Sequence, residues 1–292
     1  MKEITVLSGK GGTGKTSITA ALASVAQNAV FCDNDVDAAD LHLIFQPHVK
    51  EEHTFLSGWK ATIDIKKCSG CSLCSQYCRF DAIHSNQNNE LSINPFQCEG
   101  CRLCERICPE HAISSERNSN NYWYVSSTRF GTLVHARMGP GEENSGRLVT
   151  QVRKRAKEIA LQNQCAFIIN DGPPGIGCAT ISSLSGASLA MVIIEPTKSG
   201  LHDAQRLVEL IRSFRIRACA IINKCNLNSE MALNIEKYLE KENIPLIAKV
   251  PFDKQVVKAM TEGKTIVEYN PDSETSNIIN EIWEALKTQE PE

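Results

Sequence analysis

Short apolar runs alternate with amphipathic stretches along most of the chain. The runs are rich in β-branched residues and predict buried strands at residues 4–7, 29–32, 167–170, 190–194 and 218–222. Apolar residues recur at helical spacing in residues 17–26, 147–162, 202–213, 229–242 and 273–288. Strands that alternate with helices favour a mostly parallel sheet covered on both faces, so the pattern predicts an α/β fold.

Composition and charge favour an enzyme of the globular class. The chain has 292 residues, 42% of them hydrophobic, which allows one large domain with a small insert. The net charge of −3 gives no general attraction for nucleic acid. No apolar stretch is long enough to cross a membrane, and 13 cysteines without a signal peptide predict a reducing, cytoplasmic location.

Two amphipathic helices raise the question of surface partners. The helix at 147–162 carries basic residues outside its apolar stripe, which we interpret as a solvated face. Contact with nucleic acid or an acidic partner is the alternative. The helix at 273–288 is apolar on one side with acidic neighbours, whereas a membrane anchor of this kind is basic. We therefore expect it to dock on its own domain.

The first apolar run leads into a glycine-rich loop. Strand, loop and alanine-rich helix follow one another in the order that a phosphate-binding P-loop requires. The glycines let backbone N–H groups surround phosphates, while Lys15 would neutralise their charge and Thr16 would bind Mg²⁺. A purely structural turn is the alternative, which the complete motif disfavours. The predicted nucleotide-binding residues here are Gly9, Lys10, Gly11, Gly12, Thr13, Gly14, Lys15, Thr16 and Ser17.

Lys10 follows the first glycine of this loop directly. A lysine there marks the deviant Walker A loop of the MinD/ParA/nitrogenase-iron-protein class of ATPases, within the SIMIBI P-loop NTPases, which the segment resembles. The resemblance implies an ATP-dependent homodimer in which Lys10 contacts the ATP of the other subunit, as an arginine finger does. It also implies that Lys10, Lys15 and Asp35 are the catalytic residues.

Later segments resemble the switch and base-binding regions of the same family. Asp33 and Asp35 follow the second apolar run, and Asp171 follows the run at 167–170. The resemblance implies that Asp35 activates the attacking water. A solvated acidic loop is the alternative for the first segment. The implied Mg²⁺ residues are Thr16, Asp33, Asp35 and Asp171, and the implied adenine-lining residues are Asn223, Lys224, Pro251 and Phe252.

Between residues 68 and 108 the cysteines form two copies of the spacing Cys-x2-Cys-x2-Cys-x3-Cys. An iron–sulfur cube needs four thiolates around one point, and three closely spaced cysteines supply three of them. Disulfides are one alternative, but the reducing compartment opposes them. Zinc is another, but zinc sites usually show pairs of cysteines. The spacing therefore predicts iron–sulfur clusters.

The repeat resembles a bacterial two-cluster ferredoxin over roughly residues 60–115. In that arrangement the fourth ligand of each cluster comes from the other run. The resemblance implies two [4Fe–4S] clusters, one on Cys68, Cys71, Cys74 and Cys108 and one on Cys98, Cys101, Cys104 and Cys78. We expect a small α+β ferredoxin module at 60–115, inserted into an ATPase domain made of 1–59 and 116–292.

Cys178 is a further candidate. It follows Asp171 at the offset at which the nitrogenase iron protein has a ligand of the cluster that bridges its dimer. A small buried residue is the alternative. The resemblance makes Cys178 a possible site at a dimer interface.

Together these features predict an MgATP-hydrolysing iron–sulfur protein that couples nucleotide-dependent dimerisation to electron transfer to a redox partner or metalloprotein. The first alternative is an ATP-dependent scaffold or carrier in iron–sulfur or metallocofactor assembly. Carriers of the Mrp type use a CxxC pair near the C-terminus, and Cys219 and Cys225 are too far apart for one. The second alternative is a MinD/ParA-like spatial organiser with redox-sensing clusters.

Overall fold

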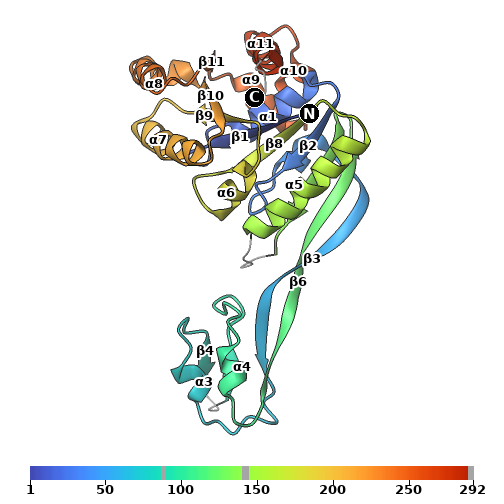
Figure 1. Ribbon diagram of the computed structural model, residues 1–292, viewed down its shortest axis with the longest axis vertical. Coiled ribbons are helices and arrows are strands. Elements are labelled where there is room, and N and C mark those ends of the chain that lie inside the picture. The colour runs from blue at the N-terminus through green and yellow to red at the C-terminus, as the bar shows by residue number, and fades with distance from the viewer. Residues whose placement is uncertain (87–89, 140–144, 289–292) are drawn as a thin grey trace. The chain divides into compact units, whose positions relative to one another are not determined.

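Parallel strands form the centre of the larger part of the molecule (Figure 1). The computed structural model describes residues 1–86, 90–139 and 145–288. Within these ranges, nine strands form one sheet in the order β11-β10-β9-β1-β8-β2-β7-β6-β3, and the pairs from β11 to β7 are parallel. The parallel strands are β1 (Lys2–Ser8), β2 (Ala29–Asp33), β7 (Gly131–Arg137), β8 (Phe167–Pro174), β9 (Leu189–Ile194), β10 (Arg217–Asn223) and β11 (Leu246–Val250). All the strands predicted from apolar runs are present; β7 and β11 were not predicted.

Helices cover both faces of this sheet, as the alternating pattern predicted (Figure 1). One face carries α1 (Lys15–Val25), α2 (Leu41–Phe45), α9 (Lys254–Thr261), α10 (Ile266–Tyr269) and α11 (Glu274–Thr288). The other carries α5 (Ser145–Gln162), α6 (Cys178–Leu184), α7 (Lys198–Ser213) and α8 (Ser229–Lys241), with the short helix η1 (Cys225–Leu227) before α8. Helix α7 begins earlier than predicted because the Thr197 side chain caps it by accepting a hydrogen bond from the N–H of Gly200.

The apolar faces of α5 and α11 are buried. Leu148 and Val152 of α5 and Ile282 of α11 have no exposed surface, so α11 docks on its own domain as expected. The solvated basic face predicted for α5 is wrong at Arg153, whose side chain is only 10% exposed. Its Nε donates to Glu3 Oε1 at 2.9 Å, and its Nη1 donates to the carbonyl oxygens of Ser182 and Ser185, so this side chain points inward.

Two long strands continue the sheet beyond β7. They are β3 (His48–Ile63) and β6 (Ile113–Thr128), and a two-residue turn joins β6 to β7, which makes that pair antiparallel. Most side chains of β3 are exposed or half-buried. A strand without a buried face lacks the apolar run that reveals the others, so the sequence did not predict it.

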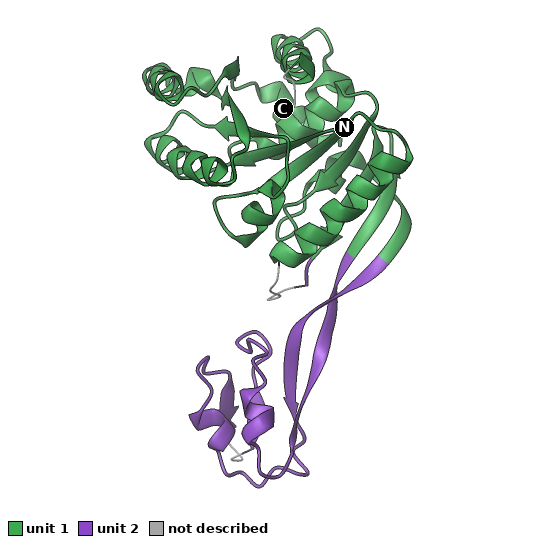
Figure 2. Ribbon diagram, in the orientation of Figure 1, with its two compact units in different colours: residues 1–52, 123–137, 145–292 green, residues 53–122, 138–144 purple. Residues whose placement is uncertain are grey.

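The chain divides into two compact units, and β3 and β6 pass from one to the other along the chain (Figure 2). Unit 1 contains Met1–Glu52, Trp123–Arg137 and Ser145–Glu292; unit 2 contains His53–Tyr122 and Met138–Asn144. Unit 2 holds the short helices α3 (Leu73–Gln76) and α4 (Leu103–Ile107) and the antiparallel pair of β4 (Ile83–Ser85) and β5 (Leu91–Ile93).

The cysteine repeat extends to the backbone of unit 2. Left-handed conformations recur at equivalent positions of the two runs, in the pairs Gly70 and Gly100, Ser72 and Arg102, and Asp81 and His111. At Gly100 a Cβ would lie 2.1 Å from the carbonyl oxygen of Trp59, so glycine is required there. The small core of the unit is Ala61, Cys74, Ile83, Leu91 and Ile113, with further cysteines packed against it.

Candidate functional site

The glycine-rich loop lies between β1 and α1, and the end of β10 holds it. Gly12 and Gly14 have φ values of 80° and 90°, which favour glycine. A Cβ on Gly14 would lie 2.3 Å from Asn223 Nδ2. Asn223 donates to the carbonyl oxygen of Thr13 at 2.7 Å, and Lys224 Nζ donates to that of Gly12 at 2.9 Å. The predicted adenine-side residues thus also fix the shape of the loop.

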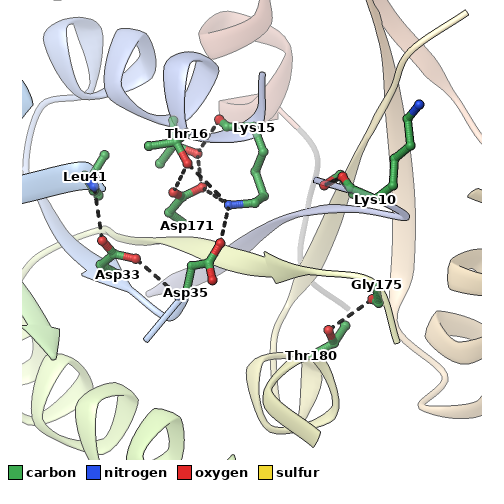
Figure 3. A network of polar contacts seen from close by, with 11 residues as sticks. Lys10, Lys15, Thr16, Asp33, Asp35, Leu41, Asp171, Gly175 and Thr180 are labelled. Atoms are coloured by element: carbon green, nitrogen blue, oxygen red, sulfur yellow. Dashed lines mark hydrogen bonds and ion pairs between the residues drawn. The ribbon is translucent and has the colours of Figure 1, made fainter. Parts of the chain in front are cut away.

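A polar network joins the first turn of α1 to the ends of β2 and β8 (Figure 3). Lys15 Nζ lies 3.1 Å from Asp171 Oδ1 and 3.6 Å from Asp35 Oδ2. Thr16 Oγ1 donates to Asp171 Oδ2 at 2.7 Å. The sheet register places Asp33 of β2 beside Asp171 of β8. Tertiary structure therefore brings together all the residues predicted to surround Mg²⁺.

Asp33 is fully buried at the end of β2. Its Oδ1 accepts from the backbone N–H of Asp35 at 3.1 Å, and its Oδ2 accepts from that of Leu41 at 3.2 Å. Burial, followed by the neighbouring Asp171 carboxylate, raises the pKa of Asp33 well above its usual range. In this structure Asp33 thus orders the loop between β2 and α2.

The same network carries excess negative charge. Burial raises the pKa of Asp35 to about 6, against the opposing effect of Lys15. Burial also lowers the pKa of Lys15, but the carboxylates of Asp171, Asp35 and Asp33 outweigh it, so this pKa is raised. Several carboxylates around one ammonium favour a divalent cation. The residues present fit Mg²⁺, which is usually held by one or two carboxylates together with phosphate oxygens and water.

A cavity of about 240 Å³ lies beside the loop, between α1, α9 and the ends of β10 and β11. Predicted residues from three segments line it together: Ser17, Asn223, Lys224, Pro251 and Phe252. Apolar side chains such as Ile18 and Met260 form its walls, which suits a flat heterocycle. The buried Thr13 Oγ1 has no hydrogen-bond partner among the described residues, so it is free to donate to a phosphate oxygen.

Lys10 points away from this network (Figure 3). Its Nζ lies 3.5 Å from Glu195 Oε2 and contacts the hydroxyls of Thr197 and Ser199 at 3.5 and 3.2 Å. Glu195 Oε1 also lies 3.3 Å from Lys224 Nζ. The Glu195 carboxylate therefore forms ion pairs with both Lys10 and Lys224. Sequence reasoning missed Glu195 because it lies far from Lys10 and Lys224 in the sequence. The three residues follow β9, β1 and β10, and they become neighbours only because these strands lie side by side in the sheet.

Cys178 is exposed at the first residue of α6. The alternative that it is a small buried residue is therefore wrong. Gly177 precedes it in extended conformation, and the helix turns its first residue outward. A role for Cys178 between subunits stays a prediction.

The two cysteine runs of unit 2 line two cavities. One is lined by Cys68, Cys71, Cys74 and Cys108. The other is lined by five cysteines, Cys74, Cys78, Cys98, Cys101 and Cys104. Each cavity contains one of the two predicted ligand sets, and Cys74 lines both cavities. The assignment of these cysteines as cluster ligands stays a prediction. The N–H groups of Ala82 and Ala112 point at Cys78 Sγ and Cys108 Sγ, at 3.4 and 3.3 Å.

The thiols in these cavities are crowded. Burial raises the pKa of Cys104 to about 11, and neighbouring thiols add to the effect. In the part of the chain that the structure describes, no three His, Cys, Asp or Glu side chains are arranged around a single metal ion. A cluster is larger than an ion, so ligands spread around a cavity fit it better than they fit zinc.

The fold and the first site together define the class of protein. A parallel sheet, a P-loop and an aspartate at the end of a neighbouring strand are the parts of a P-loop ATPase. Residues 4–266 match the family described as the CobQ/CobB/MinD/ParA nucleotide binding domain. The chain belongs to this family and is a P-loop ATPase of the MinD/ParA type.

Several individual proteins resemble this chain. An uncharacterized protein of Methanocaldococcus jannaschii is 35% identical over 291 residues, covering 98% of this chain and 96% of that protein. An iron–sulfur cluster carrier protein of Pyrococcus furiosus is 28% identical over 155 residues, covering 48% and 52%. The structure of the septum site-determining protein MinD from Pyrococcus horikoshii with Mg-ADP covers 98% of this chain and 96% of its own, with a TM-score of 0.58 at 18% identity. At this low identity, the similarity to MinD shows only that the two proteins share a fold. In the described residues, no helix has the length and apolar character needed to cross a membrane.

Proposed function

We propose that this ATPase carries two [4Fe–4S] clusters in unit 2 and couples MgATP-dependent dimerisation to electron transfer to a redox partner. The two cysteine-lined cavities support this proposal most directly, because each brings the first three cysteines of one run together with the last cysteine of the other. The clusters would supply one-electron redox chemistry. The proposed module spans residues 60–115 and interrupts the ATPase domain.

The chain's own residues would tune this chemistry. The N–H groups of Ala82 and Ala112, directed at Cys78 and Cys108, stabilise negative charge on sulfur. Removing or moving such N–H groups changes a cluster's potential, as does a change in its exposure to water. A modest rearrangement of unit 2 is therefore enough to alter electron transfer.

At the nucleotide site, we propose roles that follow from the contacts. Lys15 and Thr13 lie where they can donate to phosphate oxygens, and Thr16 and Asp171 would hold Mg²⁺ directly or through water. Asp35, whose carboxylate lies beside Lys15, would orient the attacking water. Mg-ADP in the related MinD structure supports the same ligand here. Lys10 would leave Glu195 and contact the ATP of a second subunit.

The test is an anaerobic redox titration of the reconstituted protein, monitored by EPR without nucleotide, with MgADP and with a slowly hydrolysed ATP analogue. We expect iron and sulfide for two clusters and a midpoint potential or line shape that depends on the nucleotide. The Lys15→Ala variant, which loses the phosphate-binding ammonium, serves as the control and should give the same signals in all three states. Superimposable titrations of the unchanged protein would overturn the coupling.

An assembly carrier is the second candidate, favoured by the likeness to the iron–sulfur cluster carrier protein of Pyrococcus furiosus. A carrier releases its cluster readily, which needs accessible ligands. Cys219 is fully buried on β10 and unsuited to that role. Transfer of iron and sulfide to an apo-ferredoxin within minutes would support the carrier, and stable retention would support electron transfer.

A further inference from the structure

The two-residue turn between β6 and β7 makes a dense set of contacts within unit 1. Arg129 in this turn donates to both carboxylate oxygens of Glu268, at 2.6 and 2.9 Å. It also donates to the carbonyl oxygens of Ile44 at 2.8 Å and of Gly263 at 2.9 Å. One guanidinium thus joins the end of α2, the loop between α9 and α10, and the turn that ends β6.

The turn holds Arg129 in a fixed position. Its guanidinium carbon lies 4.3 Å from the centre of the Phe130 ring, and that ring packs edge-on against Phe45 of α2, with centroids 4.9 Å apart. Thr128 Oγ1 donates to the carbonyl oxygen of Gly131 at 2.8 Å and accepts from the N–H of Phe130 at 3.1 Å. Because these contacts fix the turn, a movement of α2 must move Arg129 or break its hydrogen bonds.

Helix α2 connects Arg129 to the predicted Mg²⁺ side of the nucleotide site. The first residue of the helix, Leu41, donates its N–H to Asp33 Oδ2. The helix is only one turn and a half long and ends beside Ile44, whose carbonyl Arg129 holds. A change in the position of Asp33 is therefore passed through one short helix to the turn.

The loop between α9 and α10 connects Arg129 to the base side of the site. Met260 and Ile266, on either side of this loop, line the cavity beside the P-loop. Gly263 between them has a φ of 65°, and a Cβ there would lie 2.4 Å from Gln46 Nε2. Glu268 caps α10 by accepting from the N–H of Thr265 at 2.8 Å while it binds Arg129. Occupation of the cavity therefore acts on the partners of Arg129.

The third connection runs along the chain into unit 2. Strand β6 begins at Ile113, shortly after Cys108, and ends at Thr128, next to Arg129. We propose that Arg129 is a positioning residue that links both ends of the nucleotide site to β6, so that the nucleotide state changes the order of this strand and the surroundings of the cysteine cavities. The proposal rests on the proposed coupling between nucleotide and clusters and names the side chain that transmits it.

The variants follow from the contacts. Arg129→Lys keeps the charge but cannot bind both oxygens of Glu268 and two carbonyls at once. Glu268→Gln keeps Arg129 and weakens its strongest partner. Arg155→Lys is the matched control: Arg155 on α5 also binds a carboxylate at the start of the long strands, Glu51 of β3, at 2.7 Å, without a contact to α2 or to the α9–α10 loop in the described residues.

Hydrogen exchange followed by mass spectrometry, on the full chain with and without MgADP or a slowly hydrolysed ATP analogue, provides the test. In the unchanged protein and in Arg155→Lys, we expect nucleotide to slow exchange of β6 amides about fivefold, at the low end for coupled sites. In Arg129→Lys the loop at residues 9–16 should still be protected by nucleotide, while the response of β6 disappears. Glu268→Gln should reduce that response and tests the link if Arg129→Lys does not fold.

A β6 response that persists in both Arg129→Lys and Glu268→Gln would overturn the proposal, as would its absence from the unchanged protein. EPR of the reconstituted protein separates this failure from that of the proposed function. Nucleotide-dependent cluster signals that survive in Arg129→Lys would leave the function standing and remove Arg129 from it. A β6 response that depends on Arg129, with cluster signals indifferent to nucleotide, would support the link to β6 but overturn its extension to the cysteine cavities, together with the proposed function.

Discussion

The nucleotide site of unit 1 draws its residues from strands far apart in sequence, whereas the cysteines of unit 2 come from two short neighbouring runs. In the first, the polar groups already bind one another: Lys15 pairs with Asp171, and Asn223 holds the loop. In the second, thiols crowd around two cavities and the buried core is small. From this comparison we expect unit 1 to keep its shape without ligand, whereas the fold of unit 2 would depend on the proposed clusters.

Removing iron tests that difference most strongly. We expect iron-free protein to lose the fold of unit 2 and to keep that of unit 1, because small units with so small a buried core usually rely on a metal or another cross-link. Hydrogen exchange should show residues 53–122 unprotected and the strands β1, β8 and β9 unchanged. Cys104→Ser should reproduce part of this loss, whereas Cys225→Ser, outside the two runs, should leave iron content unchanged. Protection of residues 53–122 without iron would contradict the comparison.

The contacts of Lys10 allow a test of the proposed second subunit. Lys10→Ala should lower ATP turnover at high protein concentration by about 10³-fold, the low end for an arginine finger. Glu195→Gln should free Lys10 and lower the protein concentration for half-maximal turnover by up to about fivefold, because half-exposed ion pairs contribute at most about 1 kcal/mol.

Turnover per subunit, measured over a series of protein concentrations, checks both changes. Lys198→Ala removes an exposed lysine at the start of α7 and should behave as the unchanged protein. Equal turnover per subunit in dilute and concentrated solutions, with Lys10→Ala unimpaired, would exclude the contact in trans.

The smallest expected effect concerns the protonation of Asp35 in the nucleotide-free site. The pKa of Asp35 is raised to about 6 in the folded chain, so the folded state keeps a proton that the unfolded state releases near pH 4. Stability must then fall as pH rises between these values. Relative to Asp35→Asn, the free energy of unfolding of the unchanged protein should drop by on the order of 1 kcal/mol from about pH 4 to about pH 7, after allowance for partial exposure.

Urea titrations of nucleotide-free protein at both pH values measure this difference. The exposed Asp40, on the same loop, gives the control variant Asp40→Asn. A stability difference between Asp35→Asn and the unchanged protein that does not vary with pH would show that folding does not raise the pKa of Asp35.

Sequence reasoning located most of the nucleotide site because its signals are local. The P-loop glycines, Lys15 and Asp171 each follow or precede a buried strand, and parallel strands bring such positions to one edge of the sheet. It missed Glu195 and Arg129, whose partners are far away in sequence and whose neighbours carry no motif. It also misjudged Arg153, because helical periodicity does not reveal which ion pairs cross between elements. The burial alternative for Cys178 failed because this residue begins α6 and is exposed there.

The sequence by itself determined the parallel sheet, the helices on its faces, the phosphate-binding loop and the two equal cysteine runs, since apolar period and residue spacing are properties of the chain. Only the tertiary structure decided which cysteines share a cavity, that Lys10 pairs with Glu195, and that Arg129 joins α2, the α9–α10 loop and β6. The reason is physical. Local patterns fix which backbone conformation each segment favours, whereas ion pairs and cavities depend on distances between segments, which the packing of the sheet and helices sets.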